Sequence, residues 1–204
     1  MREPSPSLST RALLQALRTE EDSLAWFHLE ARFRPLLLGV FRRMGHGGAD
    51  AEDLMQETLL NLHAASRRGS LPRGGGELRA WLRRAAGWRS VDQRRKRRPD
   101  VARDSWLDGL PSEEELERVW ESEERRAILA EALALLRRSG GVTARSIRVF
   151  ELSVLEQHPM KEVAAAVGMQ VGTAHVAKHR CAKRLRAIAN EVSEAYWGGD
   201  PLRG

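Results

Sequence analysis

The chain has 204 residues and a formal net charge of +6 at pH 7, a basic balance that favours nucleic acid as a partner. Its single cysteine, Cys181, excludes an intramolecular disulfide framework and a cysteine-cluster zinc site. No segment reaches the ~20 apolar residues of a membrane span, and the N-terminus lacks the apolar core of a signal peptide. We therefore expect a soluble, cytoplasmic protein.

The first ordered element is expected after a lead-in. Residues 1–19 begin with a stretch rich in Pro and Ser and are predicted to be disordered. Apolar residues then recur at steps of three and four from Phe33 to Met44, and glycines from Gly45 to Gly48 follow. This pattern predicts a helix that ends at the glycines.

The next element, Ala49–Leu62 (ADAEDLMQETLLNL), has two different faces. Three polar residues at spacings i, i+3 and i+4 share one side of a helix: Asp53, Gln56 and Glu57. Three residues recur four apart on another side, as a core-facing stripe does: Leu54, Thr58 and Leu62. The pattern predicts an acidic docking helix.

A loop, GSLPRGGG, is expected next, followed by a helix from Glu77 to about Arg98 that ends in five consecutive cations. Trp81 and Trp88 lie seven apart on this helix, beside four arginines: Arg79, Arg83, Arg84 and Arg89. Aromatic rings among arginines can hold unstacked single-stranded bases. The alternative is that both rings belong to an inward-facing apolar set: Leu78, Trp81, Leu82, Ala85, Trp88 and Val91. The terminal cations can likewise meet phosphates or form a solvated helix end. Both alternatives stay open.

The C-terminal half predicts a helix-turn-helix between Met160 and Ile188. Gly168 suits the left-handed residue that ends the first helix, and Ala165 is small where the second helix should pass close. The second helix has Thr173, His175, Val176 and His179 near its start, where a recognition helix reads base edges, and cations further along. His175 and His179 have no third ligand nearby, so we expect no metal and no cofactor. The alternative is a helical hairpin that serves only as core.

No segment alternates with period two, so the predicted fold class is all-α: two small helical domains on a flexible linker. The expected divisions are a lead-in, a first domain, a linker, a second domain and a tail: residues 1–19, 20–98, 99–122, 123–192 and 193–204. The end of the linker can be partly helical, because an apolar pattern returns at Leu116, Val119 and Trp120.

Three motifs in this order resemble the extracytoplasmic-function sigma factors of bacterial RNA polymerase: DAEDLMQETLL, ELRAWLRRAAGWRSVDQRRKRR and VGTAHVAKHRCAKRLR. The resemblance implies a region 2 at residues 20–98 and a region 4 at residues 123–192. It also implies an initiation factor that is not an enzyme and needs no cofactor. Its partners would be core RNA polymerase, through the coiled coil of the largest subunit and the flap, and promoter DNA as duplex and single strand. An anti-sigma factor is a further candidate partner.

The resemblance also implies roles for individual residues. Polymerase contacts would be Asp53, Gln56 and Glu57. The loop Ser66 to Gly76 resembles one that captures a flipped base. Contacts to the −10 element would be Arg79, Trp81, Trp88, Asp92 and Arg95. Contacts to the −35 element would be Thr173, His175, Val176, Lys178 and His179, with phosphate contacts from Arg180, Lys183 and Arg184.

Departures from the family pattern limit what can be carried over. Trp88 stands where the family commonly has Asn, and His175-Val176-Ala177 replaces a commoner Lys-Ser-Arg. The promoter sequence therefore cannot be inferred by analogy. An alternative function is a stand-alone helix-turn-helix repressor or activator, which leaves the acidic face of residues 53–57 unexplained. No Gly-rich phosphate loop, nucleophile elbow or paired metal motif indicates an enzyme.

Overall fold

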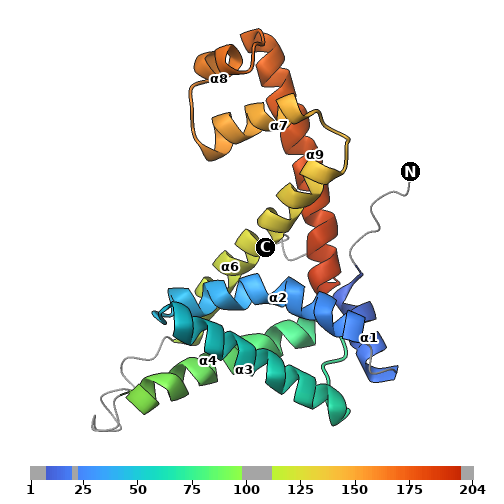
Figure 1. The fold of residues 1–204 in the computed structure, drawn as a ribbon, viewed down its shortest axis with the longest axis vertical. Coiled ribbons are helices and arrows are strands. Elements are labelled where there is room, and N and C mark those ends of the chain that lie inside the picture. The colour runs from blue at the N-terminus through green and yellow to red at the C-terminus, as the bar shows by residue number, and fades with distance from the viewer. Residues whose placement is uncertain (1–7, 20–22, 98–111, 199–204) are drawn as a thin grey trace. The chain divides into compact units, whose positions relative to one another are not determined.

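The computed structural model describes residues 8–19, 23–97 and 112–198, and in this part of the chain every regular element is a helix (Figure 1). The predicted all-α class is confirmed. The helices are α1 (Thr10–Thr19), α2 (Ser23–Arg43), α3 (Gly48–Arg67), α4 (Gly75–Arg97), α6 (Glu113–Arg138), α7 (Ala144–Phe150), the π-helical turn η1 (Glu151–Leu155), α8 (Met160–Ala166) and α9 (Val171–Trp197). None of the helices in these ranges combines the length and the apolar character that crossing a bilayer requires.

Two compact units make up the chain. The N-terminal unit contains Leu8–Ala127 together with the C-terminal residues from Glu194, and the C-terminal unit contains Ile128–Ser193. The helices α6 and α9 therefore each contribute residues to both units. This division differs from the expected domain limits at residues 98, 123 and 192, because the first part of α6 and the last turn of α9 pack into the N-terminal unit.

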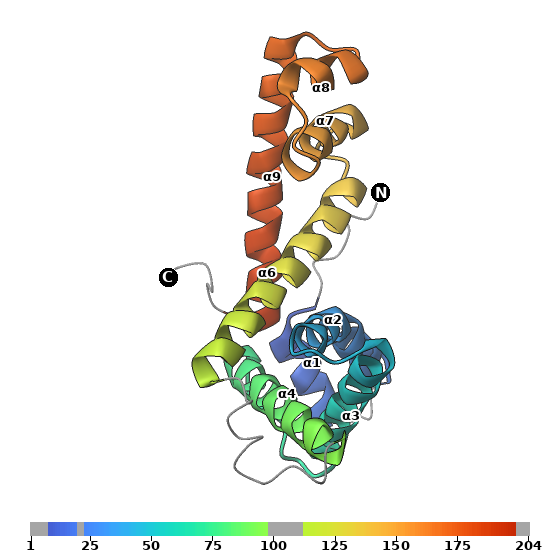
Figure 2. The same ribbon diagram turned by 90° about the vertical axis from the view of Figure 1, so that its left-hand side faces the viewer.

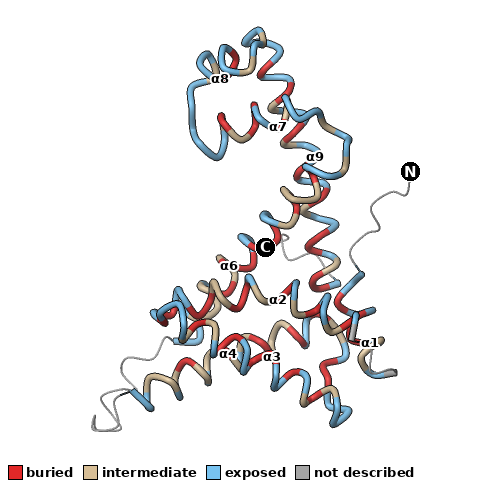
Figure 3. The backbone as a smooth tube through the Cα atoms, viewed as in Figure 1, coloured by how far each residue is buried: buried red, intermediate tan, exposed pale blue. Residues whose placement is uncertain are grey.

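The core of the N-terminal unit is built around α2. Figure 2 shows α1, α2, α3 and α4 gathered about a shared centre, and α2 contacts each of the other three helices. Its inward side chains are fully buried, in the three- and four-residue steps that the sequence predicts: Phe33, Leu36, Leu37, Val40 and Phe41. The alternation of buried and exposed segments along these helices follows from their amphipathic patterns (Figure 3).

The expected disorder of residues 1–19 is wrong from Thr10 onward, where α1 begins. Leu13 and Leu14 are buried against the unit's core, and the Ser9 hydroxyl accepts a hydrogen bond of 3.2 Å from the backbone of Ala12. The Pro- and Ser-rich stretch ends at Ser9, which caps the helix. The free energy gained by burying Leu13 and Leu14 outweighs the conformational entropy lost when this short helix becomes ordered. Residues 1–7 lie outside the described residues.

Residues 113–122, the end of the expected linker, form the start of α6. Ser112 and Glu115 make a reciprocal capping box: Glu115 N donates to Ser112 Oγ at 3.1 Å, and Ser112 N donates to Glu115 Oε2 at 2.8 Å. Trp120 is completely buried. A Cβ added at Gly87 of α4 would lie 2.9 Å from the Leu116 side chain, so this part of α6 packs tightly on the N-terminal unit. Residues 98–111 lie outside the described residues.

The expected tail at residues 193–204 is wrong up to Trp197, the last residue of α9. The rings of Tyr196 and Trp197 pack against Phe33 of α2, with centroids 5.6 and 5.5 Å away. Arg32 is buried and donates to Thr10 Oγ1 of α1 at 3.0 Å and to Ala195 O at 3.2 Å. A cation beside the last carbonyls of α9 satisfies groups that the helix itself leaves unpaired. Residues 199–204 lie outside the described residues.

Gly75 is required by this packing, and its neighbour provides a matched control. A Cβ at Gly75 would lie 2.6 Å from the backbone of Trp197, whereas a Cβ at Gly76 would have nothing within 4 Å. We expect Gly75→Ala to lower the free energy of unfolding by about 1–3 kcal/mol through overpacking. Gly76→Ala should leave it unchanged or raise it by up to about 1 kcal/mol. Urea denaturation measures both changes, and equal effects at the two positions would contradict the docking of Trp197.

Candidate functional site

The helix α3 has the two faces that its sequence predicts. Leu54, Thr58 and Leu62 are buried, together with Met55 and Leu59. The Thr58 hydroxyl donates to the Leu54 carbonyl at 2.7 Å, so its polar atom is satisfied inside the core. The polar set on the other face is exposed to solvent: Asp53, Gln56 and Glu57.

The exposed face of α3 also has an apolar residue that the sequence pattern did not indicate. Leu60 is 66% exposed and stands four residues after Gln56 and three after Glu57, which places it on the same side of the helix. Glu57 forms an ion pair with Arg89 of α4. The face therefore combines carboxylates with one exposed apolar side chain.

The helix α4 exposes Trp88 and partly exposes Trp81. The indole of Trp88 is 75% exposed, so the inward-facing alternative is wrong for this residue. The buried residues of α4 lie four apart instead, and the two tryptophans lie off that stripe: Leu78, Leu82, Ala86 and Ser90. An exposed indole of this size is available for stacking.

Two arginines of α4 are bound to carboxylates of α6. Arg79, predicted to contact −10 DNA, donates from Nη2 to Glu124 Oε2 at 2.9 Å and to Glu117 Oε1 at 2.8 Å. Arg83 also pairs with Glu117. These partners were not predicted, because the sequence placed Glu117 in the expected linker and Glu124 in the second helical domain.

The cationic end of α4 divides into two sides. Arg94 donates to the Met44 carbonyl at 2.5 Å, and Arg97 pairs with Asp50, so these two bind the turn after α2 and the first turn of α3. Asp92 and Arg95, both predicted to contact −10 DNA, lie on the other side and are both exposed. Asp92 pairs with Lys96 at 3.0 Å, a partly exposed i,i+4 pair. Arg98 lies outside the described residues.

His46 connects the same turn to α4. Its Nε2 lies 2.6 Å from Ser90 Oγ, and both side chains are buried. Burial lowers the pKa of His46, and the positive charge of Arg94 lowers it further. A neutral imidazole at neutral pH therefore fixes α4 against the loop that precedes α3.

The loop between α3 and α4 covers residues 68–74, since Gly75 and Gly76 already belong to α4. Leu71 and Pro72 are buried. Arg18 of α1 donates to both of their carbonyls, at 2.9 and 2.5 Å, and Ser66 Oγ donates to the Leu17 carbonyl at 3.0 Å. The helix α1 thus holds the loop predicted to capture a base.

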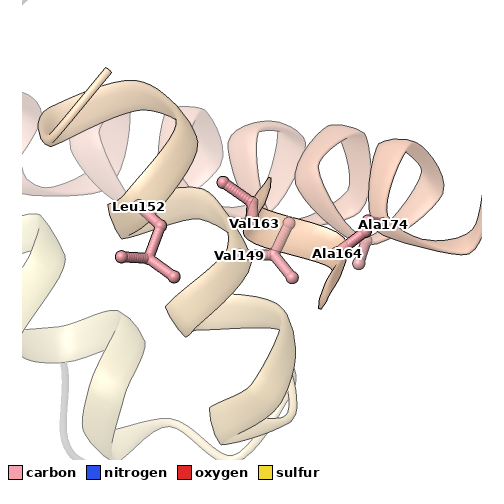
Figure 4. Close-up of a cluster of buried hydrophobic side chains, with 6 residues drawn as sticks. Val149, Leu152, Val163, Ala164 and Ala174 are labelled. Atoms are coloured by element: carbon pink, nitrogen blue, oxygen red, sulfur yellow. The ribbon is translucent and has the colours of Figure 1, made fainter. Parts of the chain in front are cut away.

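The C-terminal unit contains the predicted helix-turn-helix, α8 followed by α9. Gly168 has a φ of 64°, the left-handed conformation expected at the end of α8. Figure 4 shows the cluster that joins the helices: Val149, Leu152, Val163, Ala164, Ala174 and Ala177. The small residue facing α9 is Ala164, since Ala165 is exposed, so that expectation was wrong by one position. Cys181 is also buried, and burial raises the pKa of its thiol, so it is a core residue.

The start of α9 presents its predicted reading residues to solvent. Thr173, His175, Val176 and His179 are exposed, and Lys178 is half-buried. The predicted phosphate contacts follow on the same helix and are exposed as well: Arg180, Lys183 and Arg184. This order, small and polar side chains first and cations later, suits a helix that enters a major groove.

Comparison with known families gives a match that lies within the N-terminal unit. Residues 29–99 match the model of Sigma-70 region 2, which covers most of α2 and all of α3 and α4. The match supports a sigma-factor family and a role in transcription initiation, and region 2 in general binds core RNA polymerase and promoter DNA. A search of curated proteins found no match.

Proposed function

We propose that the chain is a transcription initiation factor of the extracytoplasmic-function sigma type. The observation that carries the proposal is the region 2 match at residues 29–99, because one matched segment contains both the exposed carboxylates of α3 and the exposed Trp88 of α4. The factor would act in the cytoplasm, where promoter DNA and polymerase are found.

In the proposed mechanism, core polymerase binds the acidic face of α3 through Asp53, Gln56 and Glu57. Upstream duplex DNA is read by the start of α9, and the −10 element is opened and held as a single strand beside α4. Unstacking a base costs a few kcal/mol, and stacking on an exposed indole offsets about 1–3 kcal/mol per base. Strand opening therefore needs no nucleotide hydrolysis by the chain.

A stand-alone helix-turn-helix regulator is the competing function, and footprinting with and without core polymerase distinguishes the two. An initiation factor should protect promoter DNA strongly only when core polymerase is present. A stand-alone regulator should protect its site by itself, with no change when polymerase is added. Protection that is complete without polymerase would contradict the proposal.

The C-terminal unit gives a separate prediction about specificity. We expect His175→Ala with His179→Ala to change which upstream sequences the polymerase complex prefers, since both side chains are exposed at the start of α9. Lys183→Gln with Arg184→Gln should weaken all sequences alike and lower the salt slope of binding by about 1 for each phosphate that is no longer neutralised. Selection from a randomised upstream region measures both. If the histidine variant weakens binding to every upstream sequence by the same factor, these histidines do not read the base sequence.

A further inference from the structure

Two arginines of α4, Arg79 and Arg83, are already bound to carboxylates of α6. Arg79 Nε and Nη2 donate to Glu124 Oε2 at 3.1 and 2.9 Å, and Nη2 also lies 2.8 Å from Glu117 Oε1. Arg83 pairs with the other oxygen of Glu117. Both arginine side chains are about three-quarters buried, at 25% and 26% exposure. Both arginines are therefore much less accessible to solvent than Trp88 on the same helix.

These ion pairs are held in place by the packing of α6. Glu124 is buried, and so is its neighbour Glu123, which pairs with Arg43 of α2 at 2.9 Å. A Cβ at Gly39 would overlap the Glu123 carboxylate, and one at Gly87 would press on Leu116. The start of α6 therefore approaches α2 and α4 closely at two glycines, where a larger residue would not fit. A chance pairing of surface charges would not need glycine at these positions.

A carboxylate and a phosphate present similar acceptors to a guanidinium group. Both accept the parallel N–H donors of arginine in a fork geometry. Arg79 and Arg83 can thus bind either the carboxylates of α6 or two phosphates of a DNA strand. For Arg79 one arrangement excludes the other, because the Nε and Nη2 donors that form its fork already face Glu124. For Arg83 the pair with Glu117 occupies one donor, Nη1.

We propose that Glu117 and Glu124 of α6 occupy, in the free protein, the arginines that bind the backbone of the opened promoter strand. Assigning the displacing ligand to promoter DNA rests on the proposed function. Single-stranded DNA must then replace two carboxylates before it can bind α4. These pairs are largely buried, so breaking them costs more than breaking an exposed pair, and a strand must be held at several other phosphates to displace them. The device suppresses binding of the free factor to single-stranded DNA.

Fluorescence anisotropy with a labelled 20-nucleotide single strand of mixed sequence tests the proposal on the full chain without polymerase. Glu117→Gln with Glu124→Gln should tighten binding by roughly 10-fold at about 0.1 M salt and steepen the salt slope by about 0.7 for each additional phosphate bound. The matched control is Glu114→Gln with Glu121→Gln, which changes the net charge equally on the same helix. Its binding should rise much less, because neither residue pairs with α4 within the described ranges.

A second pair of variants separates unmasking from a change in folding. Adding Arg79→Gln and Arg83→Gln to the unmasked variant should remove the gain. Glu117→Gln alone keeps the buried Glu124 carboxylate and should give a smaller gain in the same direction, with an unchanged thermal unfolding curve. Equal binding by the unmasked variant and its control would overturn the proposal. So would a gain that survives removal of both arginines.

Association with core polymerase, measured in parallel by co-elution, keeps the two proposals distinct. The proposed occupation of the α4 arginines by Glu117 and Glu124, called masking here, predicts the same anisotropy result whether or not polymerase binds. Absence of the anisotropy effect with intact co-elution refutes masking alone. Co-elution that fails for the wild-type chain, with the anisotropy effect present, refutes the initiation factor and leaves masking as a property of a different DNA-binding protein.

Discussion

Replacing Asp53 and Glu57 together with Ala is expected to weaken association with core polymerase by about 30-fold or more. Truncating charged partners of a desolvated interface pair costs about 2–5 kcal/mol, and both side chains are exposed on one face of α3. The fold should persist. The substitution removes the ion pair of Glu57 with Arg89, and a partly exposed pair of this kind is worth about 0–1 kcal/mol. Co-purification measures association, and thermal unfolding measures stability.

The matched control for this variant is Glu114→Ala with Glu121→Ala, which removes two negative charges from α6. It should leave association with polymerase within about 2-fold of the wild-type protein, because non-specific charge effects between exposed groups are small at physiological salt. Two outcomes would contradict a docking role for α3: unaltered binding by the α3 variant, or equal weakening in both variants.

Trp88→Ala is expected to slow formation of the open promoter complex by one to two orders of magnitude, while association with core polymerase stays unchanged. The indole is 75% exposed, so its removal creates no core cavity, and stacking of one base on an aromatic ring is worth about 1–3 kcal/mol. A template already mismatched across the −10 region should restore the rate, because the cost of unpairing has been removed. Permanganate footprinting of thymines on matched and mismatched templates measures the effect.

Two further variants give the Trp88 result its controls. Phe27→Ala removes a comparably exposed aromatic, 63% exposed, from α2 and should not change the rate of opening. Trp81→Ala affects a half-buried ring and should lower thermal stability without rescue by the mismatched template. Equal slowing for Trp88→Ala on both templates would assign that residue a structural role and leave strand capture to other side chains.

The sequence predicted correctly those features that depend on the residue pattern within a single helix or turn. The two faces of α3 follow from spacing alone, since Leu54, Thr58 and Leu62 recur at helical intervals and the carboxylates fall between them. The helix-turn-helix is equally local, because Gly168 ends α8 at the residue that must be left-handed. The exposure of Trp88 does not follow from its spacing. A seven-residue interval places Trp81 and Trp88 on one side of the helix but does not determine whether that side faces the core or the solvent.

Contacts between distant segments could not be predicted in the same way. The burial of Glu123 and Glu124 depends on Arg43 and Arg79, which lie far away in the sequence, and no periodicity identifies such partners. The sequence instead placed both residues at the start of the second helical domain, directly after the expected linker. The docking of Tyr196 likewise depends on Arg32 and Phe33. The capping box of Ser112 and Glu115 is a local signal of α6 that could have been recognised.

Run-off transcription with purified core polymerase on a library of promoter fragments tests the central claim most directly. We expect discrete transcripts from a subset of fragments only when the protein and core polymerase are both present, and their disappearance with the Asp53→Ala, Glu57→Ala variant. A chain that yields no protein-dependent transcript from any fragment, although it is folded and binds DNA, would contradict the assignment as an initiation factor.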